Sequence, residues 1–233
     1  MNKFIHRIEK KQYSIKIIGE KNQKEYSLQK LDNDFIDWQR GERKQLMELL
    51  KKDKNPVFLS PHLPTLITFD LNNPDFPVNT VCKGVGLVPI EEKLVEITQE
   101  INQIVKKIKN QDFKKTLSLR LEAANIFYDK QEIIDGYALG GLEIFESKSF
   151  ENIQKNPRVT LFFVGNSPTY KSYQLNCIAE IISPDHPFYN FIINMRSLFE
   201  EARFHFQQPV YPFAIRYHIV HILDKSLKVR PTK

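Results

Sequence analysis

Cysteine and glycine are both scarce in this chain of 233 residues, and each scarcity excludes a class of site. The two cysteines, Cys82 and Cys177, lie far apart and form no CxxC pair, which excludes a disulfide framework and a thiolate zinc site. Only eight glycines occur, where about 16 are expected at the usual ~7%. We therefore expect reduced thiols and few glycine-rich ligand loops.

Motifs of several familiar enzyme classes are also missing. The nearest approach to a dinucleotide fingerprint is residues 84–89, GVGLVP, in which Pro89 stands where the third glycine is needed for close helix packing. The chain has no GxxxxGK[ST] phosphate loop, no HExxH zinc helix and no GxSxG nucleophile elbow. These absences argue against a Rossmann site, a P-loop, a zinc protease and an α/β-hydrolase.

Long apolar runs and a strong charge bias are absent too. Charged residues interrupt the longest candidate, residues 90–108, so no run approaches the roughly 18 residues that a membrane span needs. The N-terminus lacks the apolar stretch of a signal peptide, and we expect a cytoplasmic protein without a membrane partner. The formal net charge of +6 is compatible with an anionic ligand but low for a dedicated nucleic-acid binder.

Alternating and helical patterns organise the first third of the chain. Residues 12–18 and 25–31 alternate polar with apolar side chains and predict a β-hairpin. From Asp34 to Leu50 the apolar residues follow helical spacing, which Gly41 interrupts. Five prolines between residues 56 and 77 predict an ordered loop region or a domain boundary around one short strand, residues 65–71.

The remaining residues predict an α+β fold with a mostly antiparallel sheet or barrel. The clearest helix follows Pro89, because Leu94, Ile97 and Ile101 begin a single apolar stripe. A second helix is expected over residues 187–206. We divide the chain into an N-terminal extension, residues 1–90, and a barrel domain, residues 91–233. The predicted strands are residues 116–122, 158–164, 173–182 and 213–223.

Two stretches resemble one protein family. Residues 147–163 read SKSFENIQKNPRVTLFF, and residues 171–181 read KSYQLNCIAEI. In order and spacing they are similar to the pyridoxamine 5'-phosphate oxidase-like, FMN-binding split-barrel proteins. In that family a serine and basic residues open a short helix that ends in Asn-Pro-Arg-Val and leads into an apolar strand. The resemblance covers residues 116–230 and implies a split β-barrel that acts as a homodimeric flavin-dependent oxidoreductase.

The resemblance also implies a cofactor site. Ser147, Lys148 and Ser149 would bind the FMN phosphate, with Arg120 reaching it from the preceding strand. Lys171 and Ser172 would lie near the flavin ring. This chain departs from the family pattern at several of these positions: a Ser-Arg-Lys motif becomes Ser147-Lys148-Ser149, an Arg-Gln pair becomes Lys171-Ser172, and a glycine becomes Cys177.

Other interpretations of the same residues stay open. Ser149 could simply cap the helix that follows it, and a barrel without its cofactor could serve as a binding or regulatory module. The chain also lacks the tryptophan and the Arg-x-His with which the vitamin B6 oxidase holds its substrate, because its only tryptophan is Trp38. That particular activity is disfavoured, and the substrate stays unassigned.

Histidines and lysines supply two further hypotheses. A relative of this fold binds and degrades haem, so one of His205, His218 and His221 could be an axial ligand. The last two are three residues apart in a predicted strand and should point to opposite faces unless a bulge intervenes. A basic cluster could attract phosphate or RNA, although cations are expected at a helix C-terminus and few aromatic residues interleave with it. It comprises Lys106, Lys107, Lys109, Lys114 and Lys115.

Overall fold

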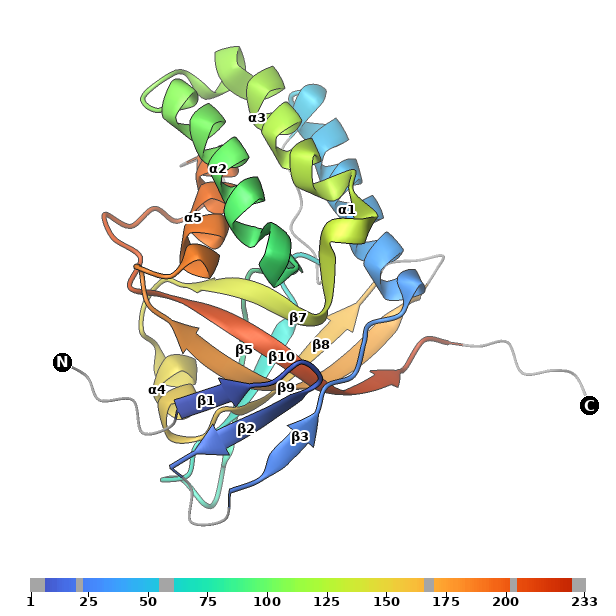
Figure 1. The fold of residues 1–233 in the computed structure, drawn as a ribbon, viewed down its shortest axis with the longest axis vertical. Coiled ribbons are helices and arrows are strands. Elements are labelled where there is room, and N and C mark those ends of the chain that lie inside the picture. Colours follow the sequence, from blue (N-terminus) through green and yellow to red (C-terminus); the bar gives the residue numbers. More distant parts are fainter. Residues whose placement is uncertain (1–6, 20–22, 55–60, 166–169, 202–204, 228–233) are drawn as a thin grey trace, which may run out of the picture.

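A seven-stranded antiparallel sheet forms the centre of the protein in the computed structural model, which describes residues 7–19, 23–54, 61–165, 170–201 and 205–227 (Figure 1). Its strands are paired in the order β5-β4-β8-β9-β10-β7-β6. They are β4 Thr65–Phe69, β5 Val78–Cys82, β6 Val85–Pro89, β7 Ile134–Glu143, β8 Arg158–Val164, β9 Ser172–Ile182 and β10 Phe213–Asp224.

The two edge strands of this sheet are consecutive in the sequence. Strand β5 ends at Cys82 and β6 begins at Val85, so only Lys83 and Gly84 connect one edge to the other. A link this short spans about 10 Å at most, and the sheet must therefore curl until its edges meet. Strands β5 and β6 are not hydrogen-bonded to each other. Only the connecting residues join these two edges, so the barrel stays split between β5 and β6. The α+β split-barrel prediction is confirmed.

Four helices cover one end of the barrel (Figure 1). Helices α2 and α5 each pack against the other and against strands of the barrel, and α3 packs beside α2. A shorter helix, α4 Lys148–Lys155, lies against β4 instead. The covering helices are α1 Asn33–Lys51, α2 Glu91–Ile108, α3 Phe113–Tyr128 and α5 Pro187–Phe199, and a 3₁₀ turn, Gln131–Ile133, leads into β7.

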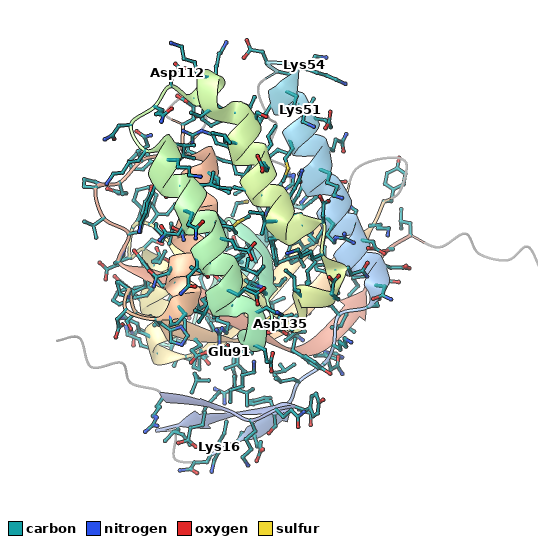
Figure 2. All side chains as sticks on the ribbon, turned by 45° about the horizontal axis from the view of Figure 1, so that its top comes forward. Lys16, Lys51, Lys54, Glu91, Asp112 and Asp135 are labelled. Carbon is teal, nitrogen blue, oxygen red and sulfur yellow. The ribbon has the colours of Figure 1, made fainter. Side chains whose placement is uncertain are left out.

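A separate three-stranded sheet lies at the end of the molecule opposite these helices, where Lys16 is labelled (Figure 2). It consists of β1 Arg7–Lys10, β2 Ser14–Ile18 and β3 Glu25–Ser27. Ile15 and Ile17 are fully buried and pack with Leu28 against Ile178 of β9. The predicted hairpin is confirmed, and a strand that precedes it completes this small sheet.

Several predicted elements are confirmed and one is wrong. Residues 116–122 were expected to form a strand but lie within helix α3. The alternation of Leu117, Leu119 and Leu121 resembles that of a strand, but the buried residues follow helical spacing. The Asp112 carboxylate also caps the helix, because it accepts a hydrogen bond from the backbone N–H of Lys115. The predicted helix 187–206 ends earlier, at Phe199.

The sheet also crosses the predicted domain boundary. Strands β4, β5 and β6 all precede residue 91, yet they supply three of the seven paired strands. Strands β6 and β7 escaped prediction because glycines interrupt their apolar runs. Within the described residues, no helix is long and apolar enough to cross a membrane.

Gly41 allows a direct test of helix α1. It lies in the interior of this continuous helix, is exposed, and a Cβ added to it would meet no atom within 4 Å. Because glycine lowers helix stability relative to alanine, Gly41→Ala should stabilise the protein by about 0.5–1 kcal/mol. Urea and thermal unfolding measure the change.

Gly140→Ala is the matched comparison. Its Cβ would lie 2.6 Å from Cγ1 of Val88 and 2.7 Å from Cδ1 of Ile192, so this variant should lose about 1–3 kcal/mol through overpacking. A Gly41→Ala variant that unfolds more easily than the parent chain would contradict the description of α1.

Candidate functional site

A cavity of about 500 Å³ lies outside the β6–β7 pair, beneath helices α1 and α5. Its volume is within the range of small-molecule sites, roughly 300–1,000 Å³. Met47 and Leu50 of α1 form one wall, and Phe191, Met195 and Phe199 of α5 form the other. Such apolar walls favour an aromatic ligand, and the methionines can adapt to its shape.

Paired glycines of β6 and β7 form the floor of the cavity. Gly86 of β6 and Gly140 of β7 are directly paired across the two strands, and four of the eight glycines in the chain line this one cavity. A Cβ on Gly86 would come within 3.4 Å of the Arg43 guanidinium, while one on Gly140 would collide with Ile192. The space over both glycines is therefore taken by side chains, by Arg43 over Gly86 and by Val88, Phe188 and Ile192 over Gly140.

Cations surround the cavity, and no carboxylate is among the described residues that line it. Arg43 donates from Nη2 to the carbonyl of Val85 at 2.9 Å, and it forms no ion pair with any acid in the described part of the chain. Lys83 is held by Glu143, with Nζ 2.9 and 3.0 Å from the two carboxylate oxygens. Arg196, the third cation, is paired with Glu200, with Nε 3.6 Å from Oε1. Arg43 is therefore the cation of the cavity that best favours an anionic ligand.

Two histidines that line the cavity are neutral at physiological pH. Burial, and then the charge of Arg43, lower the pKa of His62 to about 2. Burial, and then Arg196, lower the pKa of His205 to about 4. The His205 Nδ1 atom lies 2.7 Å from the carbonyl oxygen of Phe199. A carbonyl only accepts, so Nδ1 carries the proton and the lone pair of this neutral imidazole is on Nε2.

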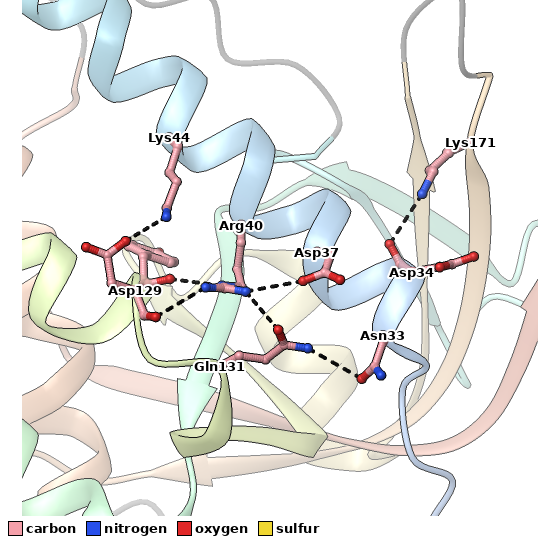
Figure 3. Close-up of polar contacts among 9 residues, drawn as sticks. Asn33, Asp34, Asp37, Arg40, Lys44, Asp129, Gln131 and Lys171 are labelled. Atoms are coloured by element: carbon pink, nitrogen blue, oxygen red, sulfur yellow. Dashed lines mark hydrogen bonds and ion pairs between the residues drawn. The ribbon is translucent and has the colours of Figure 1, made fainter.

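A polar network holds α1 in place as a wall of the cavity (Figure 3). The Arg40 guanidinium donates to the carbonyl of Tyr128 at 2.9 Å and to the Gln131 side chain at 3.0 Å. Lys44 forms an ion pair with Asp129 at 2.6 Å. These contacts tie α1 to the end of α3 and the turn before β7, and so fix the wall relative to the floor.

The residues predicted to bind the phosphate lie in different surroundings. Ser147 lines the cavity, and its hydroxyl lies 3.1 Å from that of the buried Ser149. Lys148 is paired with Asp70 at 2.7 Å, and its hydrogen bond lowers the pKa of that carboxyl. The Asp70 carboxylate therefore occupies the position beside Lys148 that a phosphate would need, and Glu151 adds a second negative charge 3.8 Å away.

The other predicted ligands lie elsewhere. Arg120 was placed on a strand, but in helix α3 its guanidinium donates to the carbonyls of Ser197 and Leu198 at 3.2 and 3.0 Å. It thereby satisfies carbonyls of the last turn of α5. Lys171 donates to the carbonyl of Asp34 at 3.3 Å (Figure 3). The backbone N–H of Ser172 donates to Ser226 at 3.1 Å, and neither Lys171 nor Ser172 lines the cavity.

The pair His218 and His221 also departs from expectation. A bulge in β10 between Ile219 and His221 places His218 opposite Ile178 and His221 opposite Asn176, so both histidines share one face of the sheet. His218 is fully buried, with Nε2 2.7 Å from Glu180, whereas His221 is exposed. Neither lines the cavity, and the described residues contain no cluster of His, Cys, Asp and Glu that could hold a metal ion.

Sequence reasoning therefore missed the main features of this cavity: Arg43, Lys83 and the glycine pair. Arg43 carries no motif, and its position depends on how α1 packs. The glycines did leave a signal, because GVG at 84–86 and GG at 140–141 account for four of only eight glycines. In a glycine-poor chain such clusters mark a close approach of the backbone to another group.

No protein-family model and no curated protein matches the chain. Similar solved structures include HutZ, a heme storage protein from Vibrio cholerae, with TM-score 0.44 and 12% identity over 84% of this chain and 95% of that one. Group A Streptococcus HupZ has TM-score 0.43 and 12% identity, covering 81% and 98%. An FMN-binding protein from Syntrophomonas wolfei has TM-score 0.42 and 11% identity, covering 83% and 92%.

Two further neighbours, from Listeria innocua and Lactobacillus delbrueckii, are named as putative pyridoxamine 5'-phosphate oxidases, the name of the family that the two stretches of sequence resemble. Similarities of this size assign neither a cofactor nor an activity to this chain.

The ion pair at the rim of the cavity gives a stability test. Lys83 and Glu143 are 12% and 2% exposed, so removing one charge leaves the other buried without its partner. Lys83→Met should cost about 3–5 kcal/mol, measured by urea unfolding. The double variant Lys83→Met/Glu143→Leu should recover much of that loss. If the single variant loses less than about 1 kcal/mol in its free energy of unfolding, the ion pair does not stabilise the closure of the barrel.

Proposed function

We propose that this chain binds FMN in the cavity between the β6–β7 pair and helices α1 and α5, and that it acts as a flavin-dependent oxidoreductase. The observation that supports it best is an apolar cavity of about 500 Å³ that Arg43 lines, with no carboxylate among its described lining residues. An isoalloxazine ring is flat, with an apolar dimethylbenzene end and a polar pyrimidine end, and FMN carries a phosphate. The apolar walls suit the ring, and Arg43 suits the phosphate.

Arg43 is the cation best suited to the phosphate. It lies over Gly86, and no acid in the described part of the chain neutralises it. Its planar guanidinium can donate two hydrogen bonds to phosphate oxygens. Ser147 is the one residue of the resemblance-based site that lines the same cavity, and it can add a hydroxyl donor. Lys148 is paired with Asp70 and does not line the cavity, so Arg43 is preferred here.

The chain would contribute position and electrostatics to the reaction. Bound FMN supplies the hydride and electron chemistry. The walls from α1 and α5 would hold the ring and exclude water, and Arg43 would fix its orientation. Neutral His62 and His205 would keep the surroundings of the ring free of further charge. The substrate is left unassigned, and the homodimer that the resemblance implies remains part of this proposal.

Haem is the second candidate, and His205 favours it. Its proton on Nδ1 is directed at the Phe199 carbonyl, and the Nε2 lone pair of a neutral imidazole is the atom that ligates iron. The cations of the cavity would then face the haem propionates. Oxidised flavin and haem have different visible spectra, so one titration of each cofactor separates the two candidates.

Paired titrations with FMN and riboflavin test the proposal. The chain should bind both, with FMN tighter. Because riboflavin lacks the phosphate, Arg43→Met should weaken FMN binding about 10- to 100-fold and leave riboflavin nearly unchanged. Gly86→Val should weaken both, since its side chain would fill the floor of the cavity. Gly41→Ala, which lies outside the cavity, is the control and should change neither.

Other outcomes contradict the proposal in distinct ways. Haem binding that His205→Ala abolishes, together with no FMN binding, would replace flavin with haem. A chain that binds neither cofactor would be a cofactor-free binding module. Equal loss of FMN and riboflavin in Arg43→Met would mean that Arg43 supports the cavity wall and does not bind the phosphate.

A further inference from the structure

Three helix ends meet at one end of the molecule, where α1 and α2 finish and α3 begins. Lys114 of α3 lies 2.6 Å from Asp53, which follows α1, so the two ends are in contact. Lys51, Lys54 and Asp112 are labelled together at this end (Figure 2). We call this surface the lysine pole. Its members, all exposed, are Lys51, Lys52, Lys54, Lys106, Lys107, Lys109, Lys114 and Lys115.

The lysine pole carries a net charge as large as that of the whole chain. Residues 51–54 and 106–115 contain eight lysines and two aspartates, which gives six net positive charges. The formal net charge of all 233 residues is also +6. Residues 7–19 and 23–27, which include the small sheet at the opposite end, contain five basic and two acidic residues. The pole is therefore the more strongly basic of the two ends, and a charge excess of this size attracts an anionic surface.

Helix capping does not explain this concentration. Cations at the C-terminal ends of α1 and α2 are favoured by the helix dipole, and Lys51, Lys106 and Lys107 occupy those ends. Lys114 and Lys115, however, lie in the first turn of α3, where the helix dipole disfavours cations. Lys114 is paired with Asp53, and the N-cap Asp112 carboxylate accepts from the backbone N–H of Lys115. The dipole therefore does not account for these two lysines.

The composition of the pole indicates the kind of partner. It contains no arginine, and the one aromatic residue in these segments, Phe113, is buried. It therefore lacks guanidinium groups, which donate two hydrogen bonds to one phosphate, and exposed aromatic rings, which stack on nucleic-acid bases. Lysine side chains act as separate point charges. These match lipid headgroups, which can move laterally to meet each charge, better than the fixed phosphate spacing of a duplex.

We propose that the lysine pole docks this protein reversibly on an anionic lipid bilayer. None of the eight positions is apolar, so the contact is electrostatic and inserts no side chain. Leu50, which lines the cavity, directly precedes Lys51, so docking would bring one end of the cavity close to the lipid surface. The sequence expectation of no membrane partner considered spanning segments, and this surface contact is a different kind of association.

Vesicle sedimentation with the full chain tests the proposal and requires no cofactor. Vesicles of equal parts phosphatidylglycerol and phosphatidylcholine should bind the chain at low salt and release it as salt rises, while pure phosphatidylcholine should not bind. Each lysine contributes about fivefold near such a surface. The variant Lys52→Gln/Lys107→Gln/Lys115→Gln should therefore lose about a hundredfold in affinity and keep its fold by circular dichroism.

The matched control removes the same charge elsewhere. Lys11, Lys24 and Lys225 are exposed and belong to no part of the pole, and their combined change to glutamine should reduce binding far less. Equal losses in both triple variants would show that net charge alone is responsible and would overturn the proposal. So would absence of vesicle binding at low salt. Tighter binding to a DNA duplex, lost in the pole variant, would replace the lipid surface with nucleic acid.

Discussion

A two-residue link between the edges of the sheet is the constraint on which the rest of this structure depends. Lys83 and Gly84 join β5 to β6, which occupy opposite ends of the strand order. The chain can make this connection only if the sheet curls into a barrel. Lys83 of this link also pairs with the buried Glu143 and so fastens the link to β7. Lys83 therefore takes part both in the link that closes the barrel and in the ion pair that stabilises this closure.

The cavity follows from this closure. Because β6 is brought beside β7, Gly86 pairs with Gly140 in the floor of the cavity, and the Arg43 side chain packs over Gly86. Helices α1 and α5, which lie about 150 residues apart in sequence, then supply facing walls. Arg43 reaches the floor from one wall, and Arg196 lies on the other. The proposed cofactor site is thus a product of topology, assembled from segments that carry no common motif.

Sequence patterns predicted the elements whose packing is simple. The stripe of Leu94, Ile97 and Ile101 gave α2, and the apolar strands β8, β9 and β10 followed from their length and composition. Helix α3 was mistaken for a strand because its leucines alternate while its buried face also includes Arg120 and small alanines. Local pattern could not show that the Arg120 side chain satisfies the end of α5, since that contact spans nearly 80 residues.

Contacts between residues far apart in the sequence also determine the candidate site. The stretch around Ser147 and Lys148 matches a family motif locally, and helix α4 forms where that motif predicts it. The partner of Lys148 is Asp70, however, which directly follows β4 and could not be inferred from the motif. The motif therefore predicts the local backbone conformation. It does not predict which charged side chain will lie beside Lys148 in the folded protein.

Amide hydrogen exchange with and without FMN tests most directly where the ligand lies. The account predicts that FMN slows exchange in residues 84–87 and 139–142, and in the segments of α1 and α5 that form the walls. Protection confined to residues 147–149 and 171–172, with none along β6 and β7, would contradict it.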